Sequence, residues 1–106
     1  MKRAVYLEPR AVQDIDRQVT YLQERSFRAA ENWLKAVEVA VDSMRVDAES
    51  HPLIPESDAI ERPLRQIMFG RRQYRYRMIY SIDDNAVHVL HVRHGMRRPL
   101  ETLDVD

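Results

Sequence analysis

The sequence predicts an α+β domain in which two antiparallel helices pack on a small, mainly antiparallel sheet, in the order β-α-α-β-β-β. Apolar residues recur at helical spacing over 9–25 and again over 26–48. Four shorter segments with alternating or continuous apolar residues predict strands, at 3–7, 64–69, 73–82 and 86–93. The 106 residues are the length of a single domain, 1–106.

The first predicted helix, 9–25, is amphipathic. Pro9 suits a first helical turn, where its missing N–H would have no intrahelical partner. The apolar stripe is formed by four residues, Val12, Ile15, Val19 and Leu22. Their polar neighbours are expected to point outward to solvent; these are Asp14, Asp16, Arg17 and Gln18.

The second predicted helix, 26–48, begins with Ser26 as a plausible N-cap. Its stripe contains Ala30, Trp33, Val37, Val41 and Met44, which places Trp33 in the core. Almost no link separates the two helices, so they are expected to double back as an antiparallel pair. The three prolines of 51–63 indicate a loop within the domain.

The last three predicted strands form a meander. Gly70 separates the first two, and the Asp-Asp-Asn turn at 83–85 joins the second to the third. The third strand is apolar on both faces, which is typical of a central strand. In the second strand one face should meet the helices, with Tyr74, Tyr76, Met78, Tyr80 and Ile82. The other face should meet solvent or a partner, with Arg75, Arg77, Ile79 and Ser81.

Charge is distributed unevenly along a chain with no net charge. Residues 1–61 hold 8 Lys or Arg against 12 Asp or Glu, whereas residues 62–98 hold 9 Arg against 2 Asp. Guanidinium groups bind phosphate or carboxylate through two parallel hydrogen bonds. A solvated sheet face is the ordinary interpretation of such arginines. Their clustering favours a binding surface, predicted to contain Arg77, His94, Arg97 and Arg98.

Several classes of site are excluded by composition. The chain has no cysteine, so no thiolate metal site, thiol nucleophile or disulfide is expected, and a reducing cytoplasm is the expected location. No apolar run is long enough for a membrane span. His88, His91 and His94 are spaced by three, which does not place all of them on one strand face, so no metal site is expected. Nothing predicts a cofactor.

The ordered set of segments resembles the RelE/ParE superfamily of toxins from bacterial type II toxin–antitoxin systems, over nearly the whole chain. "YLEPRAVQDIDRQVTYLQER" is similar to the family's opening strand and helix, and "AAENWLKAVEVAVDSM" to its second helix. "LRQIMFGRRQYRYRMIYSIDDNAVHVLHVRHGMRRP" is similar to its closing strands. The resemblance implies two helices on a small sheet. It also implies a growth-inhibiting protein, active in plasmid stabilisation, that an antitoxin neutralises in a hetero-oligomer.

The resemblance leaves the target open between three alternatives. ParE-like members inhibit DNA gyrase, RelE-like members cleave mRNA on the ribosome, and a degenerate member would bind antitoxin without toxicity. In a nuclease, Arg77 would match the strand arginine, Arg97 or Arg98 the terminal basic group, and His94 could be an acid or base. The tail "PLETLDVD" lacks the tyrosine that RelE-like nucleases usually carry. The "RHGMRR" ending resembles the ParE-like branch, so a gyrase-poisoning toxin is favoured. In that protein the same four residues would bind the target.

Overall fold

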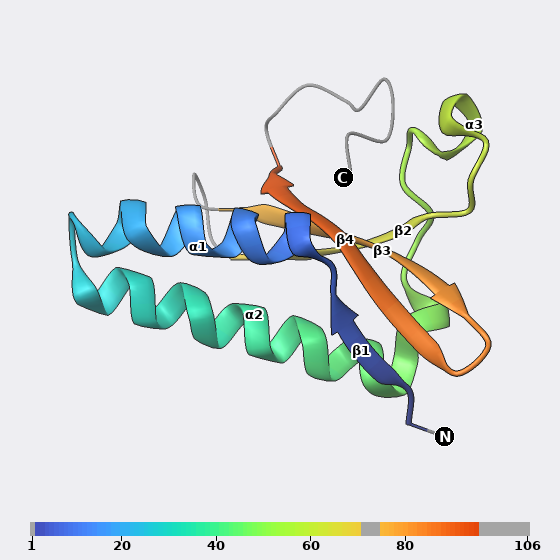
Figure 1. Cartoon of the computed structure of the whole chain (residues 1–106), viewed down its shortest axis with the longest axis horizontal. Coiled ribbons are helices and arrows are strands. Elements are labelled where there is room, and N and C mark those ends of the chain that lie inside the picture. Colours follow the sequence, from blue (N-terminus) through green and yellow to red (C-terminus); the bar gives the residue numbers. More distant parts are fainter. Residues whose placement is uncertain (1, 71–74, 96–106) are drawn as a thin grey trace.

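The computed structural model describes residues 2–70 and 75–95 (Figure 1). Its elements follow the predicted order, with a 3-10 turn and a short helix added between the long helices and the meander. They are β1 (Ala4–Leu7), α1 (Pro9–Gln23), α2 (Phe27–Asp47), the turn η1 (Ala48–Ser50), α3 (Ser57–Ile60), β2 (Arg65–Phe69), β3 (Tyr76–Asp83) and β4 (Ala86–His94). None of the helices in the described ranges has both the length and the apolarity needed to cross a bilayer.

The four strands form one mixed sheet in the order β1-β4-β3-β2. β1 is parallel to β4. The other two neighbouring pairs, β2 with β3 and β3 with β4, are antiparallel. The apolar strand β4 therefore has a neighbour on each side, which confirms the prediction of a central strand. The helices α1 and α2 lie side by side as an antiparallel hairpin against this sheet (Figure 1). The predicted α+β class is confirmed.

The starts of both long helices were predictable from local chemistry. Pro9 occupies the first turn of α1. The Ser26 hydroxyl accepts a hydrogen bond from the Ala29 N–H at 3.2 Å, so Ser26 is the N-cap of α2. Residues 24–26 are the whole link between the helices, and this short turn forces the antiparallel pairing.

The main core lies between the helices and the sheet, and Trp33 is at its centre. Trp33 is only 4% exposed, and its ring centroid lies 5.6 Å from that of Phe69 and 5.4 Å from that of Tyr76. The buried Tyr80 hydroxyl donates to the Ala48 carbonyl at 2.6 Å, and burial raises the pKa of Tyr80 to about 12. The described residues of the predicted helix-facing set are Tyr76, Met78, Tyr80 and Ile82, and all of them pack in this core. Tyr74 lies outside the described residues.

A second apolar cluster covers the opposite face of the sheet. Ile54 and Leu64, which flank α3, pack there against Ile79 and Leu90. The expectation that this face of β3 meets solvent or a partner is wrong for Ile79, which is fully buried. The segment 51–63 folds back over the sheet, because burying its own apolar residues requires an apolar surface to cover.

A register shift in β4 shapes the sheet edge beside α1. Ile79 lies opposite His91 while Tyr80 lies opposite Val89, so Leu90 is an extra residue in the strand. β1 ends with Leu7 opposite Val89. Beyond that point β4 has no strand neighbour on the β1 side, and its outward N–H groups need other acceptors.

Candidate functional site

Arg77 projects from the sheet face away from the helices, as predicted, but it is not on the surface. It is only 7% exposed. Its guanidinium forms a two-pronged ion pair with the buried Glu56 carboxylate, with one Nη1–Oε1 distance of 3.0 Å, and also donates to Gln66 Oε1 at 2.9 Å. The expectation of an exposed Arg77 is therefore wrong, because the returning segment 51–63 brings Glu56 over it.

His94 lies on the other face of the sheet from Arg77. It is opposite Tyr76 in register, and the two rings meet edge-on with centroids 5.0 Å apart. Tyr76 packs against Trp33 on the helix side and donates its hydroxyl to Gln18 at 2.5 Å. The expectation that Arg77 and His94 approach one another on one surface is therefore wrong.

The remaining residues of the predicted surface are Arg97 and Arg98, which lie outside the described residues. Gly95 precedes them and closes the end of β4. Its N–H donates to the Arg75 carbonyl at 2.8 Å. A Cβ at this position would lie 3.1 Å from that carbonyl oxygen and 3.0 Å from the Met68 methyl, so the close approach of the two strands favours glycine.

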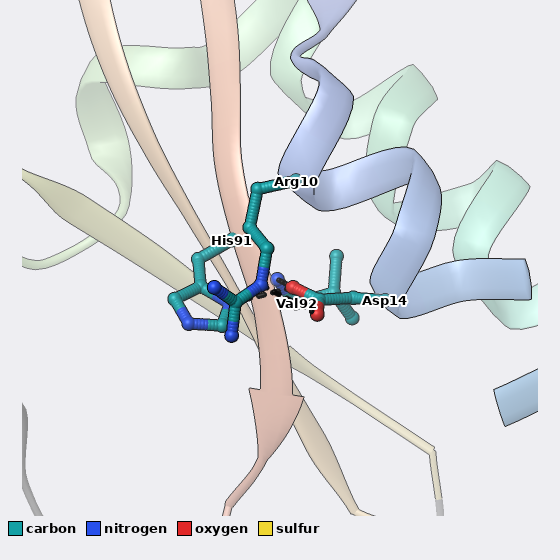
Figure 2. A network of polar contacts seen from close by, with 4 residues as sticks. All are labelled: Arg10, Asp14, His91 and Val92. Carbon is teal, nitrogen blue, oxygen red and sulfur yellow. Dashed lines mark hydrogen bonds and ion pairs between the residues drawn. The ribbon is translucent and has the colours of Figure 1, made fainter. Parts of the chain in front are cut away.

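Asp14 is the centre of a polar network that sequence patterning missed (Figure 2). Its Oδ2 accepts from the Val92 N–H at 2.9 Å and lies 2.6 Å from Nδ1 of the buried His91. Its Oδ1 accepts from Arg10 Nε at 3.1 Å. The predicted outward position of Asp14 is wrong. The edge of β4 beyond β1 presents an N–H group that needs an acceptor, and this carboxylate accepts its hydrogen bond.

The pKa of the Asp14 carboxyl lies below its ordinary value of 3.8. Burial alone would raise this pKa, but the hydrogen bonds from His91, the Val92 N–H and Arg10, together with the charge of His91, outweigh burial. The folded chain therefore prefers the carboxylate. This preference stabilises the fold above the unfolded pKa of an aspartate and is lost as the pH falls through the folded pKa.

We expect Asp14→Asn to lower the free energy of unfolding at neutral pH by about 1–3 kcal/mol, because an amide is a poorer acceptor for these buried donors. The deficit relative to the wild type should shrink as the pH falls below about 4. Urea unfolding from pH 7 downward measures both effects. Asp16→Asn, a change of the same kind at an exposed position of the same helix, is the control. A deficit that does not change with pH would contradict the assigned charge state.

His88 forms a second link between elements, on the sheet face away from the helices. Its Nδ1 lies 3.3 Å from Glu8 Oε2 and its Nε2 lies 3.1 Å from Asp83 Oδ2. The His88 ring therefore joins the start of α1 to the end of β3. Residues 2–70 and 75–95 contain no group of three or more His, Asp or Glu that could hold a metal ion.

Comparisons with known proteins define the class of the molecule. The sequence model of the family described as "ParE toxin of type II toxin-antitoxin system, parDE" matches residues 5–99. A solved structure titled "Chromosomal ParDE TA system from P. aeruginosa" is similar, with a TM-score of 0.65 and 11% sequence identity over 88% of this chain and 96% of that chain. At this identity the structural likeness concerns the fold. A search of the curated proteins finds no significant match.

The family match and the fold together therefore define a class of small toxin domains built from a helical hairpin on a four-stranded sheet. Because the family model covers nearly all of the sequence, the chain belongs to the ParE toxin family of type II toxin–antitoxin systems. This confirms the resemblance drawn from the residues, including its ParE-like branch.

Proposed function

We propose that the chain inhibits bacterial growth by poisoning DNA gyrase, and that a cognate antitoxin neutralises it. The observation that carries this proposal is the ParE family match over residues 5–99. The similar solved structure is of a chromosomal ParDE toxin–antitoxin system, which supports a toxin that acts together with an antitoxin partner. A toxin–antitoxin hetero-oligomer in the cytoplasm and a role in plasmid stabilisation belong to the same proposal.

The positions of Arg77 and His94 support gyrase over mRNA as the target. Metal-independent RNA cleavage needs an activated 2′-OH and a stabilised phosphorane at one place. The Arg77 guanidinium is directed at the Glu56 carboxylate rather than at open space. His94 lies on the opposite sheet face, against Tyr76, so the two residues do not converge on one phosphate. Arg97 and Arg98 remain proposed contacts of the target.

Induced expression with two parallel readouts tests the proposal. We expect expression of the chain to stop growth and to induce the DNA-damage response, because a poisoned gyrase leaves broken DNA. Transcripts should remain intact. Co-expression of the small gene beside the toxin gene should restore growth, and the two products should co-purify on size exclusion.

Two results would contradict parts of this proposal. Cleaved mRNA without DNA damage would identify the ribosome-dependent endonuclease instead. Unchanged growth together with a stable complex between the two gene products would identify a degenerate member that binds antitoxin without toxicity. A strain whose gyrase resists other gyrase poisons serves as the comparison strain for identifying the target.

A further inference from the structure

The segment between the long helices and the meander is a loop whose two ends are tied together. We call residues 54–64 the cover. The Ile54 N–H donates to the Leu64 carbonyl at 2.8 Å, and the Ser57 hydroxyl donates to the same carbonyl at 3.1 Å. The short helix α3 lies at the far end of the loop, apart from α1 and α2 (Figure 1). A loop with joined ends is a compact unit that can move without losing its own hydrogen bonds.

The cover is fastened to the sheet by a charged side chain. Among residues 55–63, Glu56 is the only one that is buried. Its carboxylate forms the two-pronged ion pair with Arg77 of β3. A buried ion pair adds little net stability, because the attraction between the charges is offset by the water that both of them lose. When the cover lifts, both charges return to water together, so neither is left buried without a partner.

The apolar contact beneath the cover is small and separate from the main core. The main core takes side chains from both long helices and from all four strands. The free energy gained by burial scales with the apolar area removed from water, so lifting the cover costs less than opening the main core. Segments with few buried contacts open at a lower free energy than the whole fold. The buried side chains of this second contact are Ile54, Leu64, Ile79 and Leu90.

We propose that the cover opens as a unit while the helices and the sheet stay folded, and that Glu56 is the latch that holds it closed. Opening breaks the ion pair with Arg77 and lifts the apolar ends of the cover from the sheet. Arg77, Ile79 and Leu90 then become accessible. The proposal describes a motion built into the fold, and it does not depend on which target the toxin has.

Single cysteines can report the opening, because the chain has no cysteine of its own. Leu90→Cys places a thiol beneath the cover, and the matched control Val89→Cys places one in the main core, on the other face of the same strand. A thiol reagent added to the folded protein reacts with each only when its surroundings open. We expect Leu90→Cys to react faster than Val89→Cys by a factor on the order of 10 or more. Its rate should also depend less on urea, because lifting the cover exposes less surface than unfolding does.

The role of Glu56 is tested in the Leu90→Cys background. Glu56→Gln weakens the ion pair with Arg77, so we expect labelling to accelerate by a factor on the order of 10. Asp58→Asn, which changes an exposed carboxylate of the same cover, is the control and should leave the labelling rate unchanged.

Hydrogen exchange of the unsubstituted chain, followed by mass spectrometry, needs no variant to fold. We expect peptides from the cover to exchange through local opening, well before the peptides of β3 and β4.

Three results would overturn the proposal. Equal labelling rates at Leu90→Cys and Val89→Cys, with equal dependence on urea, would mean that the cover opens only when the whole domain unfolds. Exchange of the cover at the same rate as β3 and β4 would mean the same. An unchanged labelling rate in the Glu56→Gln variant would show that Glu56 is not the latch.

Discussion

Truncating Trp33 to alanine will lower the free energy of unfolding by about 3–5 kcal/mol. The indole is 4% exposed and contacts the rings of Phe69 and Tyr76, so its loss leaves a cavity at the junction of α2 with β2 and β3. A domain of this size has a total stability of only about 5–15 kcal/mol, so the variant will be close to unfolding. Urea denaturation followed by far-UV circular dichroism measures the change.

Phe27→Ala on the same helix is the matched control for the Trp33 variant. It removes a ring of similar size that is 78% exposed, and it should change the free energy of unfolding by less than about 0.5 kcal/mol. Equal effects of the two truncations would mean that the core is not organised around Trp33.

Arg77→Ala is expected to cost about 3–5 kcal/mol of folding free energy, because it leaves the Glu56 carboxylate buried without its charge partner. The sequence pattern placed this side chain on an open surface, where its loss would cost far less. Arg75→Ala, two residues earlier and exposed, should be nearly neutral and serves as the control. The free energy of unfolding from urea titrations measures both.

A double-mutant cycle separates the ion pair from the packing around it. Glu56→Leu alone and Arg77→Met alone should each destabilise the fold, because each change leaves one buried charge without its partner. The double variant should recover most of the loss, because apolar side chains of similar volume replace both charges. Additive losses in the double variant would show that Arg77 and Glu56 act independently and would refute the buried pair.

The helices and the central strand were predictable because their signals are local. Pro9 and Ser26 mark helix starts by their own backbone chemistry, and Trp33 falls on an apolar stripe with a 3.6-residue period. β4 is apolar on both faces because it has helices on one side and the segment 51–63 on the other. Such patterns depend on the residue and its neighbours in the chain.

Asp14 and Arg77 were misplaced because their surroundings come from distant parts of the chain. Asp14 is polar and lies among polar residues of α1, yet its carboxylate accepts from the Val92 N–H at the edge of β4. This N–H lies two residues past the extra residue Leu90, which no periodicity reveals. Arg77 is covered by Glu56 from a proline-rich segment that reads as an ordinary loop. In both cases the missing signal was a buried partner from another element, which only the folded chain brings close. For Asp14 it is the His91 ring with the Val92 N–H, and for Arg77 it is the Glu56 carboxylate.

His94 was misplaced for a related reason. Proximity in sequence to Arg97 and Arg98 grouped it with the basic residues, but the alternation of side chains along β4 turns it toward Tyr76. Arg77 and His94 lie on neighbouring strands, and strand alternation separates them by the thickness of the sheet. The short link between α1 and α2 was predictable, in contrast, but nothing in the sequence indicated that Phe27, which follows it, is left exposed.

The supercoiling activity of purified gyrase in the presence of the purified chain tests the central claim most directly. With relaxed plasmid and ATP, we expect the chain to block supercoiling and to leave linear plasmid after the gyrase is denatured, which is the product of a trapped cleavage complex. Addition of the antitoxin beforehand should restore supercoiled plasmid. Full supercoiling at a large excess of chain that is toxic in cells would contradict gyrase as the target.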